Sequence, residues 1–490
     1  MTKRYLAFDL GAESGRAILG HLEGGRLSLE EVHRFPNTPV RLPTGLYWDA
    51  LRLFHEMEQG LMLVSQRTQG ALDGIAVDTW GVDFALLGVD GALVDNPRHY
   101  RDPRNDGIME KTFVTVTREE IFSHTGIQFM QFNTLFQLYA MKLASAPALE
   151  SARRLLFIPD LLSYWLTGVE RAELTIASTS QFYNPVAKRW ATELFDALGL
   201  PRTILPEIIP PGDRLGALLP HLQQAAHLGP VPVFATAAHD TASAVAAVPA
   251  AGGSWCFISS GTWSLMGVES PTPVINERSL AYNFTNEVGV GGAIRLLKNI
   301  TGMWPLQECR RAWSASGLDL PYQELARLAA ESEPFFAAID PDAFLAPGDM
   351  PSRIAQFCRD TGQRVPQAPG QFCRVILESL ALRYRQVLES LESLTGRRIE
   401  TIHIVGGGSR NSLLNQFVAD STERRVVAGP AEATAAGNIL VQALGDATIG
   451  NLDAARALVS ASFPLEIVEP STSSEWGRAY ENFRNLHPSP

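Results

Sequence analysis

Two segments of the chain share one pattern of apolar and polar positions. The first spans residues 5–20, where two short apolar runs flank a turn of small residues that follows Asp9. The second spans residues 255–268 and has the same order of apolar run, small-residue turn and apolar run. Each pattern predicts two strands joined by a tight turn, and a third strand at 27–35 extends the first into an antiparallel meander. The repetition indicates two domains that each begin with such a hairpin.

Further apolar patterns predict the elements that complete these domains. Apolar residues at helical spacing predict long helices over 48–66, with a stripe at Leu51, Phe54, Met57, Leu61 and Val64, and over 372–394. The segment 201–229 is rich in proline and glycine and predicts irregular connections. Thr117 begins a capping box, and Asp160 is a predicted helix cap. Short apolar runs and small-residue stretches predict strands over 74–78, 84–87, 231–235, 401–405 and 425–428, and helices over 118–125, 135–143, 160–167, 413–421 and 433–444.

The segment 231–245 contains the strongest candidate for a catalytic group. Its apolar start predicts a buried strand, and the small residues after Asp240 predict the start of a helix. A carboxylate at such a junction is fixed in place and open to solvent, so it can accept a proton from a bound hydroxyl group. An Asp or Thr at this point is also typical of a helix cap, which is the commoner role.

Composition and charge narrow the classes of function. A chain of 490 residues is too long for one hydrophobic core, so we expect at least two domains. With one hairpin at the start of each, we expect these domains over 1–246 and 247–490. Its hydrophobic fraction of 46% is typical of a folded protein, and its net charge of −11 argues against nucleic acid or an anionic membrane as a partner. No leader-like segment and no run of 18 apolar residues occurs, which predicts a cytoplasmic protein.

The four cysteines form neither a CxxC pair nor a metal-binding spacing with histidine. Reduced thiols are therefore expected, in keeping with a cytosolic location. A disulfide between Cys358 and Cys373 stays open at this stage. The other two cysteines are Cys256 and Cys309.

Several glycine-rich turns are suited to binding phosphate. Glycines in the first turn allow backbone N–H groups to approach an anion closely. Asp9 beside that turn would repel phosphate unless a cation such as Mg²⁺ bridges them, although an ordinary hairpin with an exposed Asp fits as well. The glycines at 406–408 stand between a strand and a helix, but the third glycine of a dinucleotide fingerprint is absent. Trp80, in a loop with Gly81, suits either a sugar platform or the core.

Taken together, these motifs resemble the FGGY family of carbohydrate kinases. The resemblance rests on Asp9-Leu-Gly-Ala with Ser-Gly-Arg16, on the Ser-Ser-Gly-Thr-Trp-Ser block at 259–264 and on Val-Gly-Gly-Gly408, and it covers nearly the whole chain in order. It implies an α/β fold of two RNase H-like domains, of the actin, sugar-kinase and heat-shock ATPase type, around a central cleft. It also implies ATP-dependent phosphorylation of the C1 hydroxyl of L-rhamnulose, with L-fuculose or L-xylulose as alternative substrates. Whether the protein is a monomer or a dimer stays open.

The resemblance assigns roles to individual residues. Asp240 is the implied catalytic base, and Asp9 the implied carboxylate that holds Mg²⁺. The family prefers a Thr-Ser or Thr-Thr pair where this chain has Ala12-Glu13, which leaves the role of the Glu13 side chain open. The implied sugar contacts are Gly81, His239, Asp240 and Thr241, and the implied ATP contacts are Ala12, Glu13, Ser14, Gly15, Arg16, Thr262, Asn299, Gln307 and Gly407.

Two other classes of protein remain as alternatives. An actin-like ATPase without a small substrate would share the hairpins, but the segment around Asp240 and the loop around Trp80 argue against it. A nicotinamide-dependent oxidoreductase could use the glycines at 406–408, but the missing third glycine and the repeated hairpins argue against that class.

Overall fold

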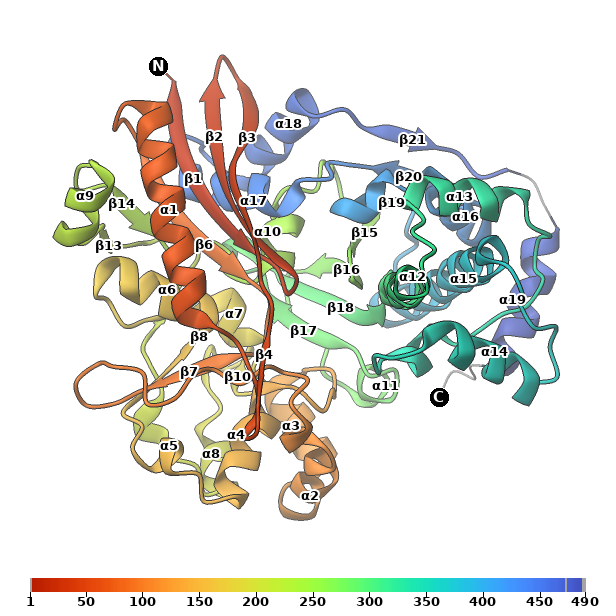
Figure 1. Ribbon diagram of the computed structural model, residues 1–490, viewed down its shortest axis with the longest axis horizontal. Coiled ribbons are helices and arrows are strands. Elements are labelled where there is room, and N and C mark those ends of the chain that lie inside the picture. Colours follow the sequence, from red (N-terminus) through yellow and green to blue (C-terminus); the bar gives the residue numbers. More distant parts are fainter. Residues whose placement is uncertain (1, 472–473, 487–490) are drawn as a thin grey trace. The chain divides into compact units, whose positions relative to one another are not determined.

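The chain folds into two units, each built around a β-sheet. The computed structural model describes residues 2–471 and 474–486, which Figure 1 labels by element. The first unit comprises Met1–Pro249, Glu269–Leu296 and Ala433–Ser462, and the second comprises Ala250–Val268, Leu297–Glu432 and Phe463–Pro490. The chain therefore passes between the units more than once.

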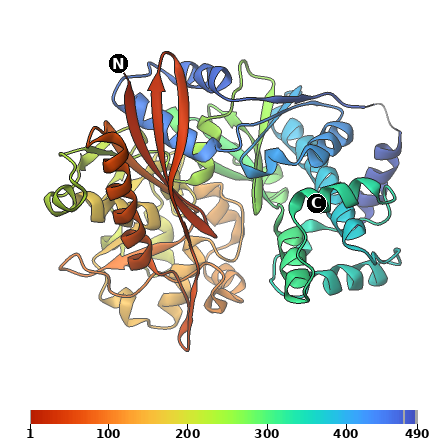
Figure 2. The same ribbon diagram turned by 45° about the horizontal axis from the view of Figure 1, so that its top comes forward.

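The sheet of the first unit has the strand order β13-β14-β6-β1-β2-β3. The predicted antiparallel meander is confirmed as β1 (Lys3–Leu10), β2 (Ser14–Glu23) and β3 (Arg26–Pro36), and β6 (Gly74–Thr79) lies parallel to β1. Helix α1 (Ala50–Thr68) packs along these strands, as Figures 1 and 2 show from two directions. The predicted stripe of α1 was wrong at Leu51, which is exposed, because Leu53 occupies the buried position instead.

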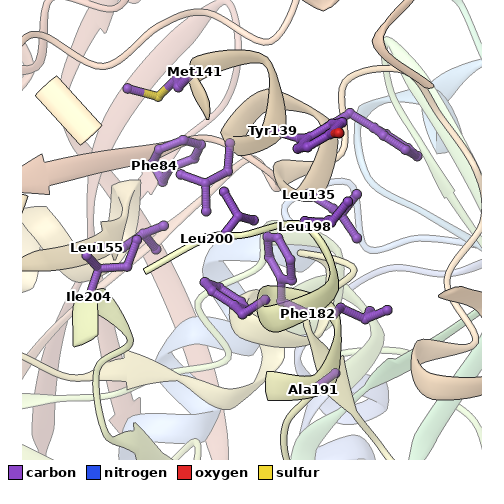
Figure 3. Packing of buried hydrophobic residues seen from close by; sticks show 14 of the residues in the cluster. Phe84, Leu135, Tyr139, Met141, Leu155, Phe182, Ala191, Leu198, Leu200 and Ile204 are labelled. Carbon is purple, nitrogen blue, oxygen red and sulfur yellow. The ribbon is translucent and has the colours of Figure 1, made fainter. Parts of the chain in front are cut away.

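Helical insertions with a core of their own complete the first unit. Aromatic and aliphatic side chains such as Phe84, Leu135 and Phe182 form this core (Figure 3). Thr117 caps the predicted helix α3, whereas Asp160 is not a cap, because α6 already begins at Ile158. The elements of these insertions are β4 (Val40–Leu42), β5 (Gly45–Tyr47), β7 (Phe84–Leu87), α2 (Ile108–Thr115), α3 (Arg118–Thr125), α4 (Thr134–Leu143), α5 (Pro147–Glu150), β8 (Arg154–Phe157), α6 (Ile158–Thr167), β9 (Ala172–Glu173), α7 (Leu174–Ser178), β10 (Tyr183–Asn184), β11 (Arg189–Trp190) and α8 (Thr192–Ala197).

The segment 201–229, which was predicted to be irregular, contains regular elements. Its proline and glycine residues separate β12 (Ile208–Ile209), β13 (Arg214–Ala217) and α9 (Pro220–Ala226) rather than preventing them. The same unit continues with β14 (Pro232–Phe234) and α10 (Asp240–Ala246). It is completed by α11 (Glu277–Ala281), β17 (Thr285–Val288), α17 (Ala433–Gly445) and α18 (Leu452–Ser462).

The second unit carries most of a seven-stranded sheet with the order β17-β18-β16-β15-β19-β20-β21. Its predicted hairpin is confirmed as β15 (Trp255–Ser260) and β16 (Trp263–Ser270), which are antiparallel, and β19 (Thr401–Val405) lies parallel to β15. The predicted long helix is confirmed as α15 (Pro369–Thr395). Strand β18 (Ile294–Thr301) begins in the first unit and ends in the second. The remaining elements of the second unit are α12 (Trp304–Ala315), α13 (Tyr322–Glu331), α14 (Met350–Asp360), α16 (Ser412–Thr422), β20 (Arg425–Ala428), β21 (Glu466–Val468) and α19 (Glu475–Leu486).

The internal repeat predicted from the sequence is confirmed by the strand pairing. In each unit an antiparallel hairpin is followed by a strand that runs parallel to its first member, β6 beside β1 and β19 beside β15. All four cysteines are buried free thiols, as expected. Among residues 2–471 and 474–486, no helix has the length and apolar character that crossing a membrane requires.

Candidate active site

The first hairpin turn is closed by its own backbone and by Asn37. The Gly11 N–H donates to Ser14 O at 2.9 Å, while the Asn37 side chain donates to Gly11 O and its backbone N–H donates to Glu13 O. Gly15 has no room for a side chain, because a Cβ there would lie 2.3 Å from the ring of Phe35. The turn around Ala12 and Glu13 is thus held in one shape, and Glu13 itself is exposed.

Two buried carboxylates stand side by side where β1 and β6 end. Asp9 and Asp78 are register partners on these parallel strands, and both are buried. The Arg16 guanidinium pairs with Asp9, and the Asn438 amide of α17 donates to Asp78 at 2.6 Å. Burial, and then the nearby Asp9 carboxylate, raise the pKa of Asp78 well above its ordinary value. The edge of the sheet thus holds two carboxyl groups, and burial with the nearby Asp9 disfavours the charged form of Asp78.

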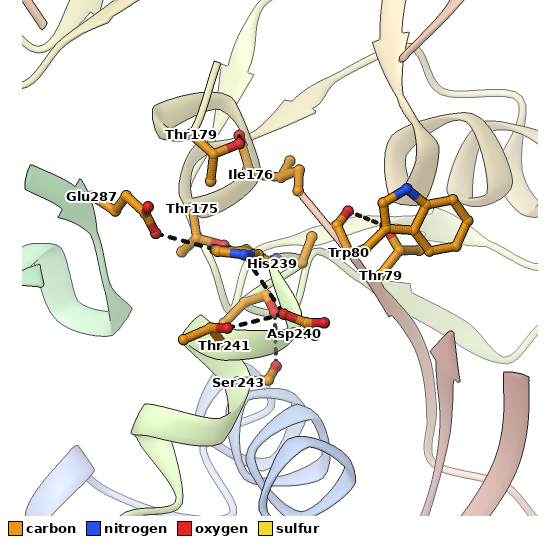
Figure 4. A network of polar contacts seen from close by, with 12 residues as sticks. Thr79, Trp80, Thr175, Ile176, Thr179, His239, Asp240, Thr241, Ser243 and Glu287 are labelled. Carbon is orange, nitrogen blue, oxygen red and sulfur yellow. Dashed lines mark hydrogen bonds and ion pairs between the residues drawn. The ribbon is translucent and has the colours of Figure 1, made fainter. Parts of the chain in front are cut away.

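Asp240 is the first residue of α10, and His239 is the helix cap. The predicted cap at Asp240 was therefore wrong by one position. The Asp240 side chain is 32% exposed, and its Oδ1 accepts a hydrogen bond from Thr241 Oγ1 at 3.0 Å (Figure 4). Its carboxylate contributes, with Asp9, to the negative field at Asp78. Asp240 thus combines a fixed backbone with an accessible carboxylate near the two buried ones.

The backbone around His239 is joined to the end of β6. Thr79 and His239 form a parallel bridge, in which the Thr79 N–H donates to Ala238 O at 2.9 Å. This bridge places Gly81 beside His239, where a Cβ would lie 3.3 Å from His239 Nε2. The structure therefore brings together Gly81, His239, Asp240 and Thr241, all four predicted sugar contacts.

Glu173 caps the start of α7 and forms a hydrogen bond with the backbone just before α10. Its carboxylate accepts hydrogen bonds from Thr175 and Ile176 on α7 and from the Ala238 N–H at 3.1 Å. The Thr175 hydroxyl oxygen in turn accepts a hydrogen bond from the backbone N–H of His239 at 3.2 Å. Burial raises the pKa of Glu173 to about 7.

Trp80 belongs to the core of the first unit. It is buried and packs against Trp48, with ring centroids 4.2 Å apart, and its indole N–H donates to Asp83 at 2.9 Å. Of the two interpretations left open by the sequence, the structure supports the core residue. Val82 has a left-handed backbone with φ of 69°, so the turn after Gly81 is tight.

The hairpin turn of the second unit is held in a comparable way. Gly261 and Thr262 form the turn, and their carbonyl oxygens accept the backbone N–H groups of Met303 and Trp304, each at 3.1 Å. Asn299 lies on β18, and Gln307 lies on α12, the next helix along the chain. The buried Oε1 of Gln307 has no hydrogen-bond partner within the described residues. Three of the predicted nucleotide contacts, Thr262, Asn299 and Gln307, thus belong to this unit.

The three glycines after β19 divide into two roles. A Cβ on Gly408 would lie 2.0 Å from Ser260 Oγ, and a Cβ on Gly406, whose φ is 83°, would lie 3.0 Å from Ser260 O. These two glycines are therefore required by the close approach of β15. A Cβ on Gly407 would meet nothing within 4 Å, so Gly407 leaves an open surface beside the hairpin turn.

Some residues of the site were missed by sequence reasoning. Asp78 ends a buried strand as Asp9 does, and that signal could have identified it. Glu173, Glu287, Arg295 and Asn438 carry no local signal, because each is joined to the site through a partner far away in the sequence.

Models of known protein families match most of the chain. The model "FGGY family of carbohydrate kinases, N-terminal domain" matches residues 4–247, and the C-terminal model of the same family matches residues 256–445. The chain belongs to the FGGY family of carbohydrate kinases. It is therefore a sugar kinase, which transfers a phosphoryl group from ATP to a sugar hydroxyl group. The family and the two-domain α/β sugar-kinase fold predicted from the sequence are both confirmed.

Individual FGGY relatives are similar over nearly their full length. A rhamnulokinase of Bacteroides thetaiotaomicron is 49% identical over 99% of both chains. A rhamnulokinase of Oceanobacillus iheyensis is 40% identical over 94% of this chain and 97% of its own. Among solved structures, a ligand-bound xylulose kinase from Lactobacillus acidophilus has a TM-score of 0.80 at 14% identity, with 99% of this chain and 96% of that chain covered. At this identity the structural likeness concerns the fold.

Proposed function

We propose that this kinase phosphorylates L-rhamnulose at its C1 hydroxyl group and produces L-rhamnulose 1-phosphate and ADP. The choice of sugar rests on the relatives named rhamnulokinase, with identities of 49% and 40% over nearly the whole chain. The choice of catalytic group rests on Asp240, a partly exposed carboxylate fixed at the first position of α10 beside His239 and Gly81.

In this proposal Asp240 is the general base. It orients the C1 hydroxyl and accepts its proton as the hydroxyl oxygen forms a bond to the γ-phosphorus and the bond to the bridging oxygen of ADP breaks. Thr241 restrains the carboxylate through its hydrogen bond to Oδ1. His239, Thr241 and the backbone at Gly81 contact the other sugar hydroxyls. Because the transition state for phosphoryl transfer is loose, positioning and charge stabilisation supply most of the catalysis.

Each unit has a hairpin turn that suits the phosphate oxygens of a nucleotide. We assign phosphate contacts to the backbone N–H groups of Ala12 to Arg16 in the first unit and to the turn at Thr262 in the second, because small-residue turns bind phosphate well. Gly407 accommodates the adenine, which its open surface supports. Asn299 and Gln307 form hydrogen bonds with the nucleotide. The buried Gln307 Oε1, which has no partner among the described residues, supports this role.

Mg²⁺ is the metal ion that we propose for this reaction. Asp9 and Asp78 offer carboxylate oxygens on neighbouring strands, and the buried Asp78 Oδ1 has no hydrogen-bond partner in the part of the chain that the structure describes. No three His, Cys, Asp or Glu side chains among residues 2–471 and 474–486 form a complete metal site, which suits Mg²⁺, since it usually takes one or two carboxylates with water and substrate phosphates. Bound Mg²⁺ would neutralise charge on the transferred phosphoryl group.

A panel of sugars tests the proposed function. Coupled ADP release is measured with Mg-ATP and L-rhamnulose, L-fuculose, L-xylulose, D-xylulose or glycerol. We expect the highest kcat/KM with L-rhamnulose. A higher kcat/KM with another ketose would overturn the assignment of the sugar. A rate of ADP release that is the same with and without each sugar would overturn the assignment of Asp240 and its neighbours to sugar phosphorylation.

The assignment of Asp9 to Mg²⁺ has its own test. Asp9→Asn removes one anionic ligand, so we expect the Mg²⁺ concentration for half-maximal activity to rise by about tenfold or more, as is typical when a group around a metal is removed. The measurement is a Mg²⁺ titration of activity at fixed ATP. Asp213→Asn, at an exposed position of the same unit, is the matched control. An unchanged Mg²⁺ dependence in Asp9→Asn would contradict the assignment.

A further inference from the structure

A buried ion pair lies against His239, and no role assigned so far includes it. Glu287 on β17 and Arg295 on β18 are joined at 3.1 Å between Oε2 and Nη2. The Arg295 side chain is fully buried and that of Glu287 nearly so. An ion pair removed from water in this way costs desolvation energy, and its charges must be matched closely. Both residues belong to the first unit, as His239 does.

The two ring nitrogens of His239 face different surroundings. Nδ1 lies 3.3 Å from Glu287 Oε2 and 3.3 Å from Arg295 Nη2. Nε2 lies 3.6 Å from Asp240 Oδ1 and would be 3.3 Å from a Cβ on Gly81. Figure 4 shows Glu287 and Asp240 joined to the ring from different sides. The ring therefore connects the buried pair with the predicted sugar contacts.

The charges of the pair select one tautomer of His239. A carboxylate can only accept a hydrogen bond and a guanidinium can only donate one. Arg295 Nη2 donates to Val288 O at 3.2 Å and forms a second hydrogen bond with His239 Nδ1 at 3.3 Å. Because the guanidinium is the donor, Nδ1 is the acceptor in this hydrogen bond. The neutral ring thus carries its proton on Nε2, which can donate a hydrogen bond.

We infer that Glu287 and Arg295 are positioning residues that hold His239 with its Nε2–H ready to donate a hydrogen bond to a sugar hydroxyl oxygen beside Asp240. The space for that hydroxyl is left by Gly81, because any side chain there would crowd Nε2. The inference rests on the proposed function, since it concerns the same sugar site. It explains how the His239 ring is oriented toward the sugar.

Arg295 has a separate part in this arrangement. Arg295 donates to Nδ1, and Glu287 holds the guanidinium in place through the ion pair. The positive charge of Arg295 offsets that of Glu287. Burial alone would raise the pKa of Glu287, but Arg295 and then His239 outweigh it and hold this pKa below its ordinary value. The pair is thus ionised, and the guanidinium of Arg295 stays aligned as the donor to Nδ1.

Glu287→Gln is the direct test, with Glu269→Gln as a matched control. Glu269 also pairs with a buried arginine of the first unit, Arg456, at 2.8 Å, and no sugar or nucleotide contact is assigned to it. We expect Glu287→Gln to lower kcat/KM for L-rhamnulose by about 10- to 100-fold, the range for residues that orient a ligand group, while KM for ATP changes by less than about twofold. Glu269→Gln should keep the wild-type kcat/KM while losing thermal stability to a similar extent.

A double-mutant cycle separates positioning from a general structural role. If Glu287 acts through His239, the double variant Glu287→Gln, His239→Ala should be no less active than His239→Ala alone. Additive losses would overturn the inference, as would a Glu287→Gln variant no less active than the control. Should Glu287→Gln fail to fold, Glu287→Asp takes its place, because it keeps the charge balance and withdraws the carboxylate from the Arg295 guanidinium. Wild-type protein without sugar-dependent ADP release would contradict the proposed function itself, a result distinct from these.

Discussion

Asp240 is the residue on which the proposed chemistry depends most. Asp240→Asn keeps the size of the side chain and an oxygen for Thr241 Oγ1, but it cannot accept a proton. We therefore expect kcat to fall by roughly 10²- to 10⁴-fold, the range for loss of a general base. Initial rates at saturating ATP and sugar measure this, with the exposed Asp213→Asn as control. Turnover close to the wild-type value would remove Asp240 from the role of base.

Glu173 gives the folded protein a defined dependence on pH. Burial raises its pKa to about 7, so the folded chain keeps a proton that the unfolded chain releases above about pH 4.5. Its contribution to stability is therefore largest below pH 4.5 and falls by about 3 kcal/mol as pH rises to 7. Glu173→Gln cannot titrate, so the free energy of unfolding of the wild type, relative to that of this variant, should decline across that window. A constant difference from pH 4.5 to 7, measured by denaturant titration, would contradict the assigned pKa.

At the residue scale, the sequence predicts groups that sit within a motif and misses those that reach the site through space. His239, Asp240 and Thr241 are adjacent, so one recognisable stretch contains them all. Glu173 reaches Ala238 across 65 positions, and Arg295 reaches His239 across 56. No periodicity or spacing reports a hydrogen bond of that sequence separation.

At the scale of elements, α10 owes its position to close packing against α17. A Cβ on Gly437 would lie 1.7 Å from Ser243 O, so this glycine allows the two helices to touch. We expect Gly437→Ala to push α10 away, to destabilise the protein by about 1–3 kcal/mol or more, and to lower kcat because Asp240 moves with its helix. Gly477→Ala on α19 meets nothing within 4 Å and should be neutral or slightly stabilising. Thermal unfolding and activity of the two variants check this, and a fully active, fully stable Gly437→Ala would contradict it.

Elements with a strong period or clear end signals could be predicted from the sequence. The predicted strands at 401–405 and 425–428 coincide with β19 and β20, and α15 ends at Gly396 as its pattern indicates. Short pieces were harder, because a few residues carry little periodicity. Asp160 is an example, since its carboxylate accepts the Glu173 N–H instead of capping a helix.

At the scale of the whole molecule, the first unit is completed by a late segment of the chain. Helix α17 returns to it, where Gln442 donates to Leu6 O at 3.1 Å and Asn438 donates to Asp78. The two hairpins were predictable because each repeats a local pattern, whereas this return was not, because it depends on polar contacts between segments far apart in sequence. In the proposed function, turn N–H groups and Mg²⁺ would supply the local positive charge that a protein of net charge −11 otherwise lacks.

The most direct test of the central claim is the position of the phosphate in the product. The protein is incubated with Mg-ATP and L-rhamnulose, and the product is analysed by ¹H–³¹P correlation NMR. We predict a phosphorus resonance coupled to the two C1 methylene protons, with one ADP formed for each ester. A phosphate ester on any other carbon, or ADP and inorganic phosphate without an ester, would contradict the account.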